Sequence, residues 1–576
     1  MPARPTLDLR DRLRLGAVAR GERAADLYLR GGRVLNVFTG EILPVNVAIG
    51  AERIAYVGER DVMVGPRTRV VDVSGRVLVP GYIDPHVHPG NLITPTSFAR
   101  HVLPLGTTTV VGDTLQFWQL GGGRAVRAAA DALAGSPLKF FWMLRVHGQS
   151  RAGDERGQFP LGELARTLAH PWVLAVGEVT RWPDAHGGDR ELLRRLDLAL
   201  SRGKRVEGHT AGASAEKIPP IAIAGVTSDH EPITAKEVLE RARQGIAVML
   251  RESSLRPDLR GLLAALEAAP ALVSRLMLTA DGSMPAFVRD HGFVDNLLRL
   301  AMAGGVAPID AYRMATLNPA TYYNLDAHVG SIAPGRFADI CVLPDLAEPR
   351  PAMVIARGHV AAEEGRLLAR VTEPAWRRIF SSPRARLAGT WKARADDFAL
   401  PRRAKYPVLR LVSAVISRLE ERPLAEGDLH AALFDRRGQW VAPGVVADFA
   451  PALDGLAATT TTDFNIVVLG RNRASMAQAV NRVKALGGGI VIVDGARVVY
   501  EMALPVAGLM SPRPLVDAAA QEDDLRAALV ALGYRHHEPT FTLFFLAADF
   551  LPAVRLSPLG VWDVKRGRVL MPARRR

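Results

Sequence analysis

The sequence predicts a (β/α)8 barrel of the TIM type, inserted into a small split β-sandwich and followed by a C-terminal α/β domain. Three observations lead to this fold class. Apolar strands alternate with helical stretches over roughly 250 residues, the usual size of such a barrel. Short alternating runs broken by glycine precede and follow that region. Near the C-terminus, strand, helix and strand patterns follow one another again.

Length and composition indicate a large folded protein. With 576 residues, the chain is too long for one simple domain. Its 48% hydrophobic and 23% charged residues are typical of folded proteins, and no apolar run is long enough to span a bilayer. The formal net charge of +14 is spread along the chain without a nucleic-acid motif, so we expect no nucleic-acid partner. The single cysteine, Cys341, excludes internal disulfides and suits a cytoplasmic location.

The first 79 residues divide into an extension and half of a sheet domain. Residues 1–24 are rich in arginine but contain acidic residues and no apolar signal core, which favours a solvated helical extension over a targeting peptide. Strand patterns follow in residues 25–79 and return in residues 328–375. We predict that these two pieces form one composite β-sandwich, split by a barrel at residues 80–327.

The barrel strands are predicted at eight apolar segments, namely 77–79, 107–112, 140–146, 173–179, 205–208, 225–228, 246–251 and 276–279. In a (β/α)8 barrel the active site lies at the C-terminal ends of the strands. Residues that carry chemistry should therefore follow these segments.

Ligand-type side chains do follow them. His86 and His88 come after the first strand, and alternate side chains of a strand point the same way. Neutral imidazole is the commonest protein ligand for metals. Four more ligand-type residues follow the fourth, fifth, sixth and eighth strands: Glu178, His209, His230 and Asp281. Each alone is compatible with an ordinary hydrogen-bonded loop residue, but together they predict a metal centre at the barrel mouth.

Several longer segments resemble the amidohydrolase superfamily and, within it, bacterial adenine deaminase. They include PGYIDPHVH at 80–88, GEV at 177–179, SDHE at 228–231, PGRFAD at 334–339 with Phe337 at its variable position, and AGLMS at 507–511. The resemblance extends from about residue 25 to the end of the chain.

The resemblance implies two divalent metal ions, of Zn, Mn or Fe. One ion would be held by His86, His88 and Asp281 and the other by His209 and His230. Glu178 would bridge them, where many relatives use a carbamylated lysine. The two ions would share a metal-bridging hydroxide, because each lowers the pKa of bound water.

The resemblance also implies roles in catalysis. Asp281 would carry the proton from the attacking oxygen to the leaving nitrogen. Glu231 would either protonate a ring nitrogen or orient His230. Arg251 and Glu252 would either hold the substrate or form an ion pair across the barrel mouth.

Other segments differ from adenine deaminases. After the two histidines the usual IESS is replaced by residues 89–92, PGNL, and the usual DPHE of the second strand by residues 113–116, DTLQ. Because Leu115 and Gln116 end this altered segment and Phe117 and Trp118 follow it directly, we expect Gln116 and Trp118 to contact the substrate. We also expect a bulkier or more apolar heterocycle to be preferred over adenine. The alternative is that this segment packs against the C-terminal domain.

The C-terminal domain is predicted at residues 385–576, after a basic, irregular stretch at 381–405. Strand, helix and strand are expected at 464–470, 475–486 and 490–493. Its glycine turns lack the GxGxxG spacing, which favours plain turns over a nucleotide cradle. The resemblance implies that this domain packs beside the barrel mouth.

The sequence therefore predicts a metal-dependent hydrolytic deaminase of the adenine deaminase type, acting on an aminated purine or a related heterocycle. Two alternatives stay open: an amidohydrolase that cleaves a cyclic or exocyclic amide, and a non-catalytic binding relative. The expected partners are a small-molecule substrate and further copies of the chain in a homo-oligomer, without nucleic acid or membrane.

Overall fold

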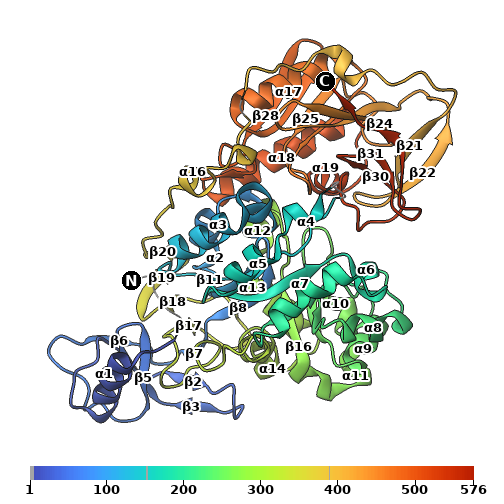
Figure 1. The fold of residues 1–576 in the computed structure, drawn as a ribbon. Coiled ribbons are helices and arrows are strands. Elements are labelled where there is room, and N and C mark those ends of the chain that lie inside the picture. Colours follow the sequence, from blue (N-terminus) through green and yellow to red (C-terminus); the bar gives the residue numbers. More distant parts are fainter. Residues whose placement is uncertain (1–5, 151–153, 388) are drawn as a thin grey trace.

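The computed structural model describes residues 6–150, 154–387 and 389–576. The first five residues of the predicted extension therefore lie outside the described part. Figure 1 shows three parts in chain order: a β-sandwich near the N-terminus, a central barrel, and a C-terminal domain on the side of the barrel away from the sandwich.

The sandwich consists of two sheets. The first contains β5 (Arg53–Gly58), β4 (Asn46–Gly50), β1 (Leu27–Arg30) and β6 (Arg69–Asp72), in that order. The second contains β20 (Arg366–Leu367), β19 (His359–Glu363), β18 (Met353–Ala356), β17 (Ile340–Leu343), β7 (Val77–Pro80), β2 (Arg33–Leu35) and β3 (Ile42–Pro44). Because β7 pairs with β17, this sheet joins the segment that precedes the barrel in the sequence to the segment that follows it. Leu29, Leu78 and Ile340 share one apolar cluster between the sheets.

The N-terminal extension contains helix α1 (Leu9–Arg20), which begins at the capping carboxylate of Asp8 and ends at Gly21 with φ +82°. The expectation of a solvated helix is wrong for one of its faces. Leu15 and Val18 are buried and belong to the same apolar cluster as Tyr28 of the first sheet. Burial of these side chains holds the helix against the sandwich.

The barrel is an eight-stranded parallel sheet of β8 (Tyr82–Val87), β10 (Thr107–Asp113), β11 (Lys139–Leu144), β12 (Val173–Val179), β13 (Arg205–Gly208), β14 (Ser228–Asp229), β15 (Ala247–Arg251) and β16 (Leu276–Thr279). At the seam between the first and last strands, Val87 forms a bridge with Asp281. The carboxylate of Asp84 accepts hydrogen bonds there from the Thr279 hydroxyl (2.8 Å) and the Ala280 amide (2.9 Å). Asp84 thereby ties the first strand to the last.

The prediction of the first barrel strand at residues 77–79 is wrong, since these residues form β7 of the sandwich. Pro80 and Gly81 separate two apolar runs that the sequence reading merged. Proline has no amide hydrogen to donate, and Gly81 donates its own to the carbonyl of Asp339 in the sandwich domain. The barrel strand therefore starts at Tyr82.

Helices follow the strands around the barrel. The longer ones are α2 (Pro95–Val102), α3 (Leu115–Leu133), α5 (Leu161–Leu168), α7 (Arg190–Leu200), α9 (Ala235–Arg243) and α13 (Val294–Ala303). Short ones include α6 (Trp182–His186), α8 (Ile218–Ile223), α10 (Leu259–Leu262) and α12 (Pro285–His291). Helix α5, for example, buries Leu164 and Leu168 on one of its faces.

The C-terminal domain is built on one sheet, whose main path is β22 (Ser417–Arg422), β21 (Tyr406–Leu411), β24 (Trp440–Ala447), β23 (Leu429–Phe434), β26 (Ile466–Gly470), β25 (Gly455–Ala458), β27 (Gly489–Asp494) and β28 (Arg497–Ala503). Helices α17 (Arg473–Leu486), α18 (Leu515–Ala531) and α19 (Pro539–Phe545) accompany it, with a three-stranded sheet of β30 (Val554–Ser557), β31 (Gly560–Asp563) and β32 (Arg568–Pro572). Gly488 has φ +124°, and a Cβ there would lie 2.2 Å from the Cα of Gly508. Glycine is required here because the two backbone segments approach each other too closely for a side chain.

Short segments join the C-terminal domain to the barrel. Strand β29 (Met510–Ser511) pairs in parallel with β9 (Leu92–Ile93), which follows the two histidines of the first barrel strand. The hydroxyl of Ser97 donates to the carbonyl of Arg513. The side chain of Glu522, on α18, accepts the amide of Ala286 on α12. The C-terminal domain is therefore anchored beside the loops that carry the predicted ligands.

Candidate metal centre and active site

All six predicted metal ligands meet at the barrel mouth. Their ligand atoms form three sets, each with all atoms within 4.8 Å of one another: His86, His88 and Glu178; His86, His230 and Asp281; and Glu178, His209 and His230. Within them, two pairs of imidazole nitrogens lie 3.1 Å apart (His86 and His88) and 3.2 Å apart (His209 and His230). The strand ends thus place four imidazoles and two carboxylates around a common space.

Glu178 lies between the two histidine pairs. Its Oε1 is 3.7 Å from His88 Nε2, and its Oε2 is 2.5 Å from His209 Nδ1 and 3.7 Å from His230 Nε2. Oε2 is buried and close to an imidazole nitrogen, but it accepts no hydrogen bond of acceptable geometry from any described residue. A buried carboxylate oxygen without a hydrogen bond is uncommon. Together with the surrounding nitrogen donors, it fits a cation shared between the two pairs.

Arg145, at the end of the third barrel strand, was missed by the sequence reading. It is fully buried, and its Nε donates to Asp113 at 2.5 Å while Nη2 pairs with Glu178. Burial alone would raise the pKa of Glu178, but Arg145 and His209 hold it well below its usual range. The sequence did contain one signal for Arg145, namely a charged residue at the end of an apolar strand segment.

Glu207 was also missed. Its fully buried carboxylate lies 2.9 Å from Nδ1 of both His86 and His230. A carboxylate at Nδ1 favours the tautomer with its proton there and leaves Nε2 free for a metal. Its signal in the sequence was a charge inside a buried strand, two residues before His209.

Asp281 follows the last barrel strand and faces the first histidine pair. Its Oδ1 lies 3.3 Å from His86 Nε2 and 3.2 Å from His88 Nε2, and its Oδ2 lies 3.5 Å from Arg251 Nη1. The backbone of Asp281 has φ +49°, a left-handed conformation that costs on the order of 1 kcal/mol or more in a non-glycine residue. Such conformations concentrate at functional sites, where the surrounding structure enforces them.

Glu231 and Arg251 form an ion pair at the mouth. The Oε1 atom of Glu231 is also 3.7 Å from His209 Nδ1 and from His230 Nε2. Burial raises the pKa of Glu231, but Arg251 and His209 outweigh it and bring the value to about 2. Since Glu207 holds Nδ1 of His230, it is Glu207 that orients this ring.

A cavity of about 820 Å³ opens above the ligands, within the size range of small-molecule sites. Arg251 and five of the six ligand-type residues lie in its wall, namely His88, Glu178, His209, His230 and Asp281. The C-terminal domain contributes an apolar wall of Phe541, Phe544, Phe545, Phe550 and Leu551. The ring of Phe550 packs edge-on against His209, with centroids 5.0 Å apart. The space is closed on one side by aromatic surface next to the ligands.

Two of the four predicted substrate contacts lie in the wall of this cavity, namely Arg251 and Gln116. Trp118 and Glu252 are not among the described residues that line it. Trp118 is buried on the other side of α3, where its ring stacks on Phe159, because a helix turns about 100° per residue. Glu252 accepts the amide of Leu259 and caps a turn. Trp118 therefore takes part in local packing and Glu252 in a local hydrogen bond.

Comparison with known proteins agrees with this geometry. The model of the amidohydrolase family matches residues 77–363, and that of the adenine deaminase C-terminal domain matches residues 414–568. A protein of Halalkalibacterium halodurans named "Putative adenine deaminase" is 34% identical over 570 residues, covering 97% of each chain. The adenine deaminase of Moorella thermoacetica is 33% identical over 570 residues, covering 95% of this chain and 96% of its own.

Among the described residues, none of the helices combines the length and apolar character that a membrane crossing requires. The near full-length similarity, the two matched domains and the six converging ligand-type side chains lead to one assignment. The chain belongs to the adenine deaminase family of the amidohydrolases.

Proposed function

We propose that this protein is a metal-dependent hydrolase of C–N bonds that deaminates adenine or a closely related aminopurine. The observation that carries the proposal is the buried carboxylate of Glu178, set between two histidine pairs at the mouth of a barrel. In the reaction, water adds to the ring carbon that bears the amino group. The C–N bond then breaks, ammonia leaves, and the ring keeps a carbonyl group.

The donor set fits two divalent ions. His86, His88 and Asp281 would hold one, His209 and His230 the other, and Glu178 would contact both. Imidazole with carboxylate suits Zn, Mn or Fe. When bound, such ions lower the pKa of water toward neutrality and so supply a nucleophile near pH 7.

The protein's own side chains supply orientation and proton transfer. Asp281 has one oxygen near the first histidine pair and the other near Arg251, so it can take a proton on the ligand side and release it to the leaving nitrogen. Glu207 keeps His86 and His230 in one tautomer. Glu231 and Arg251 offer an acceptor and a donor to the ring nitrogens of a purine.

The experiment measures ammonia release from adenine by metal-loaded protein, beside ring opening of a panel of cyclic amides. We expect ammonia from the aminopurine and no cleavage of the amides. Cleavage of a cyclic amide without ammonia from any aminopurine would support the amidohydrolase alternative. No metal and no turnover after growth in supplemented medium would support a non-catalytic relative.

A matched pair of variants tests the bridge. Glu178→Gln keeps the shape but removes the charge between two cations, so bound metal and turnover should fall together. Glu252→Gln makes the same change at a carboxylate outside the cavity and should leave both unchanged. Full metal occupancy in Glu178→Gln would contradict the bridging role.

We further propose a cytoplasmic location and a homo-oligomer. The single thiol, Cys341, is free and buried, which suits a reducing compartment. Leu9 and Leu13 of α1 are 73% and 65% exposed, which leaves apolar surface for a second copy. Light scattering at several protein concentrations measures the assembly state.

A further inference from the structure

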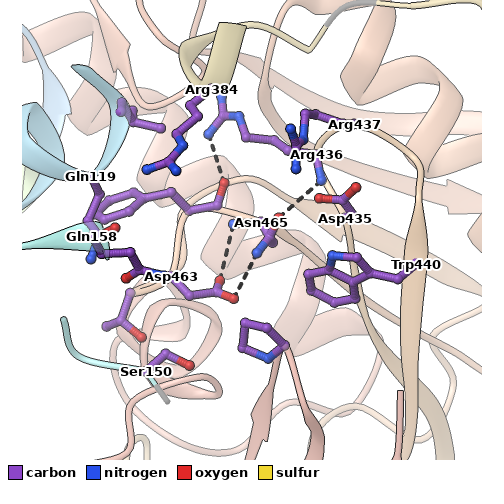
Figure 2. Close-up of a pocket in the computed structure, with 14 residues that line it drawn as sticks. Gln119, Ser150, Gln158, Arg384, Asp435, Arg436, Arg437, Trp440, Asp463 and Asn465 are labelled. Carbon is purple, nitrogen blue, oxygen red and sulfur yellow. Dashed lines mark hydrogen bonds between the residues drawn. The ribbon is translucent and has the colours of Figure 1, made fainter. Parts of the chain in front are cut away.

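A second cavity, of about 230 Å³, lies between the barrel and the C-terminal domain (Figure 2). In Figure 2 the barrel residues Gln119, Gln158 and Ser150 lie along one side, opposite Trp440 of the C-terminal domain. Its described lining shares no residue with that of the cavity above the metal ligands. It is a separate pocket at the junction of two domains, a common place for ligand sites.

Arg436 lines this pocket and is a buried cation that forms no ion pair among the described residues, although Asp463 and Asp435 favour its charged form from a greater distance. It is 5% exposed, and its guanidinium donates to the carbonyls of Phe464 (2.8 Å) and Ala507 (2.5 Å). Its Nε has no hydrogen-bond partner among the described residues. Burial lowers the pKa of Arg436 to about 10. A buried charge is usually paired, so the pocket holds positive charge that the protein compensates only in part.

Two further arginines line the same pocket, Arg384 and Arg437, and both are exposed. Among the described residues neither guanidinium forms an ion pair. In Figure 2 both are labelled at the edge away from Ser150, with Asp463 and Asn465 between. Three guanidinium groups therefore line one small cavity.

The two carboxylates of the pocket are engaged within their own loops. Asp463 accepts hydrogen bonds from the Thr461 hydroxyl (2.9 Å), the Asn465 amide (3.1 Å) and Asn465 Nδ2 (3.0 Å). Asp435 accepts the amide of Gln439 at 2.9 Å. Burial raises the pKa of Asp463, which weakens its opposition to an anion. Even with both carboxylates charged, three arginines leave an excess of one positive charge.

Uncommitted donors complete the lining. The hydroxyls of Ser150 and Thr462 are buried and have no partner among the described residues. The ring of Trp440 is only partly buried and offers a flat surface. The pocket thus combines three arginine side chains, two hydroxyl donors and one aromatic ring.

We infer that this pocket binds the phosphate group of a small metabolite. Guanidinium groups match the oxygens of phosphate in a fork geometry, and Ser150 and Thr462 supply further donors. The volume exceeds that of a few waters at about 30 Å³ each, so there is room for part of a nucleoside beside Trp440. Free phosphate and a 5′-nucleotide offer the same chemistry to the three arginines.

The experiment titrates the full-length protein with inorganic phosphate, adenosine 5′-monophosphate and adenosine in a calorimeter, at constant ionic strength set with chloride. We expect saturable binding of phosphate and of the nucleotide, with one site per chain that adenosine does not occupy. A nucleotide about tenfold tighter than phosphate identifies a nucleotide site, and equal affinities identify a site for the free anion.

Variants locate the binding. Arg384→Ala with Arg437→Ala should weaken binding of both probes at least about tenfold, since a hydrogen bond to a charged group contributes on the order of that factor. Arg386→Ala removes a neighbouring exposed arginine that does not line the pocket and should bind as the wild type does. Equal melting temperatures exclude misfolding as the cause. Absence of saturable phosphate binding, or equal affinity in the double variant, would overturn the inference.

Discussion

Arg181 and Asp549 form a buried ion pair, with Nη2 and Oδ2 3.1 Å apart, that ties the end of the fourth barrel strand to the C-terminal domain. Arg181 stands three residues after Glu178 and also pairs with Glu155. The amide of Asp549 donates to the carbonyl of Gln149 at 2.8 Å. The next residue, Phe550, packs on His209. The C-terminal domain thus completes the wall of the catalytic cavity.

We expect Asp549→Ala to weaken both stability and substrate binding. Removing one partner of a buried ion pair costs up to about 3–5 kcal/mol, and the remaining contact of Arg181 with Glu155 reduces that cost. The control is Asp523→Ala, which breaks the exposed pair between Arg289 of α12 and Asp523 of α18, 2.8 Å apart, at a cost of about 0–1 kcal/mol. Thermal unfolding and KM are measured for both. If the two variants changed the melting temperature and KM equally, the Arg181–Asp549 pair would have no specific role in shaping the cavity.

Glu207→Gln should reduce metal affinity and turnover by about 10–100-fold, the usual effect of losing a group that orients a metal ligand. The amide can accept a hydrogen bond only through its single oxygen, so it cannot accept one from each Nδ1–H as the two carboxylate oxygens do, and one ring loses its fixed tautomer. Elemental analysis and kcat are measured at several metal concentrations. Excess metal should restore part of the activity. A variant with normal metal content and normal kcat would make Glu207 a merely structural group.

The barrel and the convergence of ligand-type residues at its mouth could be predicted because both follow local rules. Apolar strands alternate with helices, and ligand-type residues end the strands, so His86 or Asp281 could be placed from position alone. Glu207 and Arg145 act through other side chains, and their partners become apparent only when strands lie side by side. The aromatic wall could not be predicted at all. Phe550 is separated from His209 by more than half of the length of the chain, whereas the side chain of Trp118, close to the altered segment, points away from the cavity because of its position on the helix.

Asp281→Asn should lower kcat far more than it changes KM. The amide occupies the same space but cannot carry a proton, and a general base typically contributes about 10²–10⁴-fold. Steady-state kinetics across pH separate the two parameters. If KM rose strongly while kcat stayed near the wild-type value, Asp281 would be a substrate-binding group.

Glu522 makes stability depend on pH. Burial raises its pKa to about 8, with Glu538 and Asp523 adding to the rise and Arg526 opposing it. In the folded state the group keeps its proton up to about pH 8, whereas the unfolded chain loses it near its ordinary pKa of about 4.3. Stability is therefore lost as pH rises through this window, by up to a few kcal/mol.

Glu522→Gln stays neutral and still accepts the Ala286 amide, so its advantage in melting temperature over the wild type should grow from pH 5 to pH 8. Asp517→Asn, at an exposed carboxylate of the same helix that does not contribute to the pKa shift of Glu522, serves as the control for the general loss of one negative charge. A constant difference between Glu522→Gln and the wild type across this range would show that Glu522 is already ionised when folded.

Substrate choice is the last prediction. Phe541, Phe544, Phe545 and Phe550 give the cavity an apolar wall, so an adenine with an apolar ring substituent should react with a higher kcat/KM than adenine. Phe550→Ala should reduce that preference by about tenfold, since it removes stacking and buried area together. Trp118→Phe, outside the cavity, should leave the preference unchanged. Because Phe550 lines the cavity and Trp118 is not among its lining residues, a change in preference with Trp118→Phe but not with Phe550→Ala would return specificity to the α3 segment.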